Sequence, residues 1–244
     1  MNSQFKNVLV AGAAFAGILA FSAPAFAVTM KAVYEGTVYN SFDIFDLFEQ
    51  NGASLNGLSY TLTYIYDAAT PGALPFTSSA QNSIVGGTAI GNINPVQSAT
   101  LVIGGHTEVI NSNFYGVATN YNDGSTAYGN HYMQNMFNDG TTEVANWIQA
   151  IAYDSSLTVP LDLDTSYVIA AAMLGSSGDF RFRHYDIGTD LHTTFASGHL
   201  VATSLTITSL EAVPLPAALP MLVAGLGAMG FMGWRRRRKP VAVA

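Results

Sequence analysis

The sequence predicts an all-β fold, an antiparallel and jelly-roll-like β-sandwich, with an N-terminal signal helix and one C-terminal transmembrane helix attached to it. Apolar and polar residues alternate with a period of two in the middle of the chain, turn sequences separate the alternating segments, and helical periodicity is scarce outside the two ends. Many short strands without amphipathic helices between them favour a sandwich or barrel. We expect a signal peptide over residues 1–27, a single exported domain over 28–212 and a separate C-terminal segment over 213–244.

The N-terminus has the pattern of a secretory signal peptide. Lys6 lies in a polar leader, residues 8–21 are apolar, and Ala25 and Ala27 form a small-x-small cleavage site. The apolar run is short for a membrane span and a proline follows it, which argues against a retained helix. The mature chain is therefore expected to begin at Val28.

Nine segments of the exported part are predicted to be strands. In SYTLTYIYD, residues 59–67, tyrosine or leucine occupies every second position, as a half-buried strand requires. In DFRFRHYD, residues 179–186, Phe180 and Phe182 face one way while Arg181 and Arg183 face the other. The other predicted strands are short and rich in β-branched or aromatic residues: 31–39, 99–103, 108–110, 114–119, 145–153, 166–174 and 200–210.

Turn sequences punctuate these strands. Asn122-Asp123-Gly124, Asn138-Asp139-Gly140, Gly86-Gly87 and Gly104-Gly105 supply residues that tolerate positive φ, and we interpret them as hairpin signals. Residues 42–49, FDIFDLFE, leave two alternatives open. They form either a short turn of helix with Phe45 and Phe48 on one face or a structured loop.

Charge and cysteine content exclude several classes of function. Between the two targeting segments the chain carries three cations, Lys31, Arg181 and Arg183, against sixteen acids, which gives a formal charge of −13. No basic stripe is available to meet phosphates, so nucleic acid is not expected as a partner. The absence of cysteine excludes disulfides, a thiol nucleophile and thiolate metal sites.

The C-terminal segment combines a short proline motif, an apolar stretch and a basic cluster. Residues 215–234 carry no charge over 20 positions, which as a helix would span roughly 30 Å, the thickness of a bilayer core. Five cations follow directly and are expected to stay on the cytoplasmic side: Arg235, Arg236, Arg237, Arg238 and Lys239. This orientation places the exported domain outside.

The tail resembles the PEP-CTERM class of bacterial sorting signals in its VPLPA variant. The motif is matched by Val213, Pro214, Leu215, Pro216 and Ala217, with Leu215 where the commoner motif has Glu. The resemblance implies export by the general secretion machinery, cleavage by signal peptidase and processing by an exosortase-type membrane transpeptidase. It also implies a link to exopolysaccharide and biofilm matrix. The alternative is an ordinary C-terminal membrane anchor.

Candidate metal and catalytic residues are sparse. Asp162 and Asp164, with Asp154 or Asp123, offer hard oxygen ligands for calcium, but the spacing of a full calcium loop is missing and solvated loop acids are favoured. The five histidines are scattered, and neither an HExxH nor a GxSxG motif occurs. We therefore expect no metal, no cofactor, no catalytic residues and no enzymatic activity.

Trp147 and the many tyrosines are the candidates for a sugar-stacking platform. Flat aromatic rings bury the apolar face of a sugar, but the alternating run 145–153 around Trp147 favours a place in the core. The sequence thus predicts an exported surface or matrix protein without catalytic activity, held at the inner membrane facing the periplasm and then released to the cell surface or matrix. The alternatives are a carbohydrate-binding module for exopolysaccharide and, less favoured, a polysaccharide hydrolase with paired acids.

Overall fold

The computed structural model describes residues 28–50 and 54–210. Within them the only helix is one 3-10 turn, Thr88–Ile90, so the all-β class is confirmed. The strands are β1 (Thr29–Asp43), β2 (Ser59–Asp67), β3 (Leu74–Thr77), β4 (Gln81–Gly86), β5 (Val96–Ile103), β6 (His106–Ile110), β7 (Tyr115–Asn122), β8 (Ala127–Asn138), β9 (Thr142–Tyr153), β10 (Tyr167–Ile169), β11 (Ser177–Asp186) and β12 (Leu191–Leu210).

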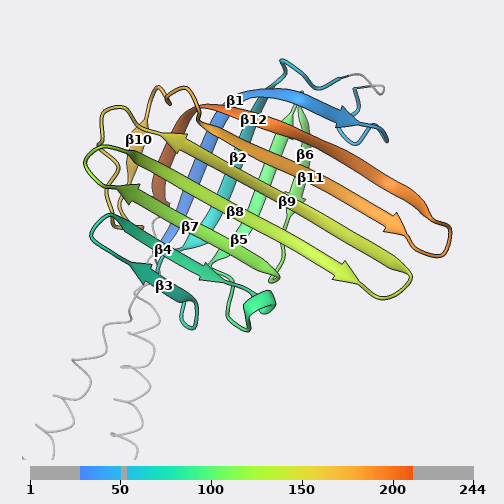
Figure 1. Cartoon of the computed structure of the whole chain (residues 1–244), viewed down its shortest axis with the longest axis horizontal. Helices are drawn as coiled ribbons and strands as arrows, with labels where there is room; N and C mark the ends of the chain where they lie inside the picture. Colours follow the sequence, from blue (N-terminus) through green and yellow to red (C-terminus); the bar gives the residue numbers. More distant parts are fainter. Residues whose placement is uncertain (1–27, 51–53, 211–244) are drawn as a thin grey trace, which may run out of the picture. The chain divides into compact units, whose positions relative to one another are not determined.

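All the strands belong to one antiparallel sheet. Its order is β3-β4-β7-β8-β9-β11-β12-β1-β2-β5-β6, and β10 pairs with β12 outside this path. The sheet curls so that β7, β8, β9 and β11 lie across β2, β5 and β6 (Figure 1). The arrangement is a half-barrel with two facing layers. It differs from the expected jelly-roll-like sandwich because the two layers are joined by continuous hydrogen bonding through β12 and β1.

The curl is built into the pairing of β1 with β12. Between Glu35 and Gly36 the register shifts, so that Thr203 has no partner on β1, and such a bulge bends and twists a strand. The Thr203 hydroxyl donates to the Glu35 carbonyl at 3.1 Å. Gly36 is required at this point because a Cβ there would lie 1.9 Å from the carbonyl oxygen of Val201.

The predicted strands are present, the one over 166–174 only as the three residues of β10, and three others were not predicted. Each of the nine predicted segments overlaps an observed strand, whereas β3, β4 and β8 have no counterpart among them. Both Asn-Asp-Gly sequences and Gly104-Gly105 form the hairpin turns that they predict. Gly86-Gly87 does not join paired strands, since β4 pairs with β7. Residues 42–49 contain no helix: β1 continues to Asp43, whose carboxylate accepts from the Leu47 and Phe48 amides at 2.8 and 2.9 Å.

The core between the layers is rich in aromatic rings. The alternation predicted for β2 is confirmed, because Tyr60, Leu62, Tyr64 and Tyr66 are all buried. Phe48, which follows the turn at Asp43, packs edge to face on Phe180 with ring centroids 5.8 Å apart. Phe45 is exposed, so the two phenylalanines do not share a face.

A histidine lies at the centre of this core. His131 on β8 is fully buried, with the rings of Tyr64 and Tyr66 at 5.4 and 4.9 Å between centroids. The Tyr34 hydroxyl donates to the Gly129 carbonyl at 3.1 Å, so we assign the hydrogen of the neutral imidazole to Nδ1, which lies 2.8 Å from the Tyr34 oxygen. Nε2 has no hydrogen-bond partner among the described residues. Burial lowers the pKa of His131 to about 3, which keeps the ring neutral.

The predicted targeting segments lie outside the described residues. They comprise the signal peptide with Ala25 and Ala27, and the tail with its VPLPA motif and basic cluster. No helix in residues 28–50 and 54–210 is both long and apolar enough to cross a membrane.

His131 predicts a specific acid sensitivity. Its pKa in the folded state, about 3, is below the ordinary value of about 6.5, so the unfolded chain binds the extra proton. Proton binding by the unfolded chain therefore lowers the unfolding free energy progressively as the pH falls from 6.5 towards 3, and has no effect above pH 6.5. Between pH 7 and 4.5 the wild type should lose about 2–3 kcal/mol more unfolding free energy than His131→Gln in urea titrations.

The exposed His192 supplies the matched control. His192→Gln should show the same pH dependence as the wild type. An equal loss of stability on acidification in wild type and His131→Gln would contradict the buried neutral state.

Candidate functional site

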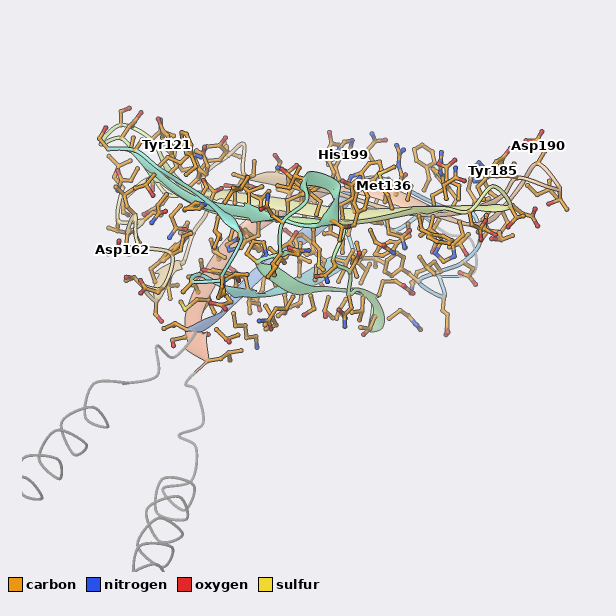
Figure 2. The ribbon with its side chains drawn as sticks, turned by 90° about the horizontal axis from the view of Figure 1, so that it is seen from below. Tyr121, Met136, Asp162, Tyr185, Asp190 and His199 are labelled. Atoms are coloured by element: carbon orange, nitrogen blue, oxygen red, sulfur yellow. The ribbon has the colours of Figure 1, made fainter. Side chains whose placement is uncertain are left out.

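The candidate site is a groove on the outer face of the sheet, on the side of β9, β11, β12 and β1 that faces away from the core. Its volume is about 310 Å³. We call it the outer-face groove. It is lined by Asn40, Phe42, Trp147, Asp179, Phe180, Arg181, Ser197, Gly198 and His199. His199 projects from the same outer side of the sheet as Tyr121 (Figure 2).

Strand register brings these residues together from four separate parts of the sequence. Trp147 on β9 pairs with Arg181 on β11, Arg181 with Ser197 on β12, and Ser197 with Phe42 on β1. Ser197 is small, so it forms a low floor between the taller side chains of the neighbouring strands. The walls stand two strand spacings apart, about 10 Å.

A second bulge in β1 turns two aromatic rings to this face. Tyr39 pairs with His199 and Phe42 with Ser197, so three steps along β1 match two along β12. In a regular strand, residues three apart lie on opposite faces. Asn40 absorbs the extra step with φ 47°, a left-handed conformation that asparagine tolerates. Tyr39 and Phe42 are consequently both on the outer face, 56% and 59% exposed.

One wall of the groove is a stacked pair. The Arg181 guanidinium carbon lies 4.2 Å from the centroid of the Trp147 ring, within the range of a cation–π contact. Trp147 is half-buried and lies on the face opposite to its buried neighbour Ile148. The place in the core that the alternating pattern favoured for Trp147 is therefore wrong.

An acid and a histidine close the other part of the groove. Asp179 and His199 face each other across β11 and β12, and the carboxylate hydrogen-bonds to Nδ1 of the imidazole. The ring of Tyr39 lies 5.3 Å from that of His199, tilted by 31°. Together with Arg181, Asn40 and Ser197, this pair lines an aromatic groove with hydrogen-bonding groups of both kinds.

Tyrosines continue the aromatic surface beyond the groove. Tyr121 and Tyr128 stack across β7 and β8 with centroids 4.9 Å apart and planes at 10°, and Tyr153 on β9 meets Tyr128 at 5.3 Å. Tyr115 and Tyr132 form a further pair at 5.7 Å. All five are half-exposed on the outer side of β7, β8 and β9.

The acids considered as calcium ligands are used differently. Asp123 accepts hydrogen bonds from the backbone of Ser125 and Thr126, and Asp154 from the backbone of Ser156 and Thr158, so each holds its own turn. Asp162 and Asp164 are exposed beside a separate hollow. In the part of the chain that the structure describes, no three His, Asp or Glu side chains gather as a metal site would require.

Comparison of the chain with protein-family models, with curated proteins and with solved structures finds no match. Function is therefore inferred from the groove itself.

Sequence patterns reveal part of this site. Alternation places Arg181 and Arg183 on one face of β11, but the partners of that face come from other strands. The signal for the bulge is the run Tyr39-Asn40-Ser41-Phe42, in which an asparagine separates two aromatic positions that alternation alone would put on opposite faces. The predicted sorting and cleavage residues lie outside the described residues.

The bulge predicts a backbone requirement at Asn40. A β-branched residue is disfavoured at φ 47°, so Asn40→Val should lower the unfolding free energy by about 1–2 kcal/mol in urea titrations. Asn40→Gly should keep it within about 1 kcal/mol of the wild type. Asn40 is exposed, so neither change removes a core contact. Equal stability of the valine and glycine variants would show that the left-handed conformation is not required.

Proposed function

We propose that this chain is an exported, non-catalytic protein of the bacterial cell surface or exopolysaccharide matrix, and that its outer-face groove binds carbohydrate. The observation that carries the proposal is the groove. Exposed aromatic rings, a low floor and polar side chains lie together on one sheet face, built from four strands.

The chemistry of the groove suits a sugar ring. A pyranose presents an apolar face of C–H groups and an edge of hydroxyls, so it is recognised by an aromatic ring together with donors and acceptors. Phe42 supplies an exposed ring. Asn40, Ser197 and the Asp179–His199 pair supply polar groups around it. A spacing of about 10 Å between the wall strands leaves room for one flat ring with side chains on both sides.

Polysaccharide suits the surface better than a single sugar. The tyrosines of β7, β8 and β9 extend the aromatic surface away from the groove along the sheet. Trp147 and Tyr153 are six residues apart on β9, which corresponds to about 20 Å of extended strand. A linear chain laid over that distance would touch several rings.

Export and sorting form the second part of the proposal. We infer that residues 1–27 are a cleaved signal helix, that 28–212 form the exported sandwich-like domain, and that 213–244 are a VPLPA-type sorting signal with one transmembrane helix. The secretion machinery, signal peptidase and an exosortase-type transpeptidase are the proposed partners. The precursor would be held at the inner membrane facing the periplasm, and the processed protein would reach the surface or matrix beside the polysaccharide.

Carbohydrate binding predicts a fluorescence response from Trp147. The chain has two tryptophans, so in a Trp234→Phe background Trp147 is the sole emitter. Exopolysaccharide purified from the native host should change this emission with saturation. Phe42→Ala should weaken the binding by about tenfold, because an exposed ring that stacks on a sugar contributes on the order of 1–2 kcal/mol.

Phe76→Ala is the matched control. Phe76 on edge strand β3 is also exposed, at 57%, but it does not line the groove. Its affinity should equal that of the parent. If Phe42→Ala and Phe76→Ala bind alike, the groove is not the binding site.

Sorting predicts that the tail is processed. Pro214 and Pro216 stiffen an extended segment next to the apolar stretch, within reach of a membrane enzyme. Replacing both prolines with alanine should leave export unchanged but block conversion to a shorter form in the native host, as followed by intact-mass analysis. Wild-type protein that still carries Trp234 and Arg235 at its C-terminus would support the ordinary anchor instead.

A further inference from the structure

The groove contains a cation that has no partner acid within residues 28–50 and 54–210. Among the described residues, Arg181 makes no ion pair. Its Nε, like that of Arg183, is buried without a hydrogen-bond acceptor, so the missing ion pair is what distinguishes Arg181. Arg183, two residues further along the same strand face, pairs with Glu143 across β11 and β9. In an exported part with three cations and sixteen acids, an arginine that forms no ion pair among the described residues is unexpected.

The surroundings of Arg181 hold it ready for a ligand. The Trp147 ring covers one side of the guanidinium at 4.2 Å, which restricts its rotation. On the other side its cross-strand neighbour is Ser197, a small residue on the groove floor. The planar fork of N–H donors therefore borders the groove, and such a fork matches the two oxygens of a carboxylate.

We propose that the outer-face groove is specific for an acidic polysaccharide, and that Arg181 is the residue that selects it by pairing with the carboxylate of a uronic acid unit. The inference rests on the proposed function and deepens it by naming the class of sugar. Phe42 stacks on the face of the sugar ring, and Arg181 binds the carboxylate at the edge of that ring. The chain as a whole is acidic, so general electrostatic attraction does not draw such a polymer to it, and the selectivity comes from this one contact.

Asp179 is the acid nearest to Arg181 along β11, and its negative charge affects the binding of an anionic sugar. Its carboxylate is engaged by Nδ1 of His199, directly across the strand pair. It lies two residues from Arg181 on the same face, where a free carboxylate would repel the ligand. Asp179→Asn is accordingly expected to strengthen the binding of an anionic sugar, in the opposite direction to Arg181→Gln.

The test compares polymers that differ only in charge. Polygalacturonate and alginate are each titrated against their methyl esters, which keep the backbone and lose the negative charge, with full-length Trp234→Phe protein and Trp147 fluorescence. The parent should bind at least one acid form about tenfold or more tighter than its ester, because a charge-assisted pair is lost on esterification. Arg181→Gln should bind acid and ester equally, and Arg181→Lys should recover part of the preference.

Arg183→Gln is the matched control and should keep the full preference, since Arg183 is paired with Glu143. The proposal is overturned if the parent binds ester as tightly as acid, if Arg183→Gln loses the preference as Arg181→Gln does, or if poly-glutamate binds as tightly as the uronate polymers. In the first case glycan binding itself stands. Failure to bind any acid, ester or host polysaccharide overturns the proposed function together with the inference.

Discussion

The pairing of β1 with β12 is the contact on which the rest of the sheet depends, because it joins the two layers and extends along almost the whole length of β1. Their register runs from Thr29 with Leu210 to Asp43 with Ala196, so the first described strand is completed by the last. Every other strand attaches on one side or the other of this pair, directly or through neighbours. Contacts between such distant segments carry a high entropic cost and slow folding.

Two bulges in this strand pair determine the shape of the sheet and which side chains lie on its outer face. The first, at Gly36 and Thr203, bends the sheet over its own core. The second, at Asn40, lies further along β1 and brings Tyr39 and Phe42 to the outer face. A bulge moves side chains from one face to the other without any change in composition. Fold and candidate site are thus linked by backbone geometry, and a change that disturbs β1 would disable the groove without altering a residue that lines it.

The polar side chain at the centre of the core explains why strand β8 could not be predicted from alternation in the sequence. β2 was predictable because tyrosine and leucine fill its core-facing positions. In β8 the core-facing positions include Gly129 and His131, while tyrosines lie on the outer side, so the alternation of apolar residues is reversed. Gly129 is glycine because a Cβ there would lie 2.5 Å from the Tyr167 hydroxyl. His131 is accommodated by Tyr34, 97 positions away in sequence. The two Asn-Asp-Gly turns lie at the two ends of β8. Because each hairpin needs two arms, these turns imply a strand between them.

The two arginines of β11 show a second limit of prediction from sequence patterns. Alternation within β11 predicts that Arg181 and Arg183 share a face, and the structure agrees, but alternation cannot distinguish the two. Their difference lies in the neighbouring strand: Arg183 meets Glu143, whereas Arg181 meets Trp147 on β9 and Ser197 on β12. Two identical side chains on one strand therefore have different chemistry. Arg183 is neutralised by Glu143, whereas Arg181 is stacked on Trp147 and has no ion-pair partner in the part of the chain that the structure describes. Because the distinction arises from register between strands far apart in the chain, it was accessible only after the sheet order was known. Arg183 therefore serves as an internal reference for Arg181. The two residues share residue type, strand and face, and they differ in their partners.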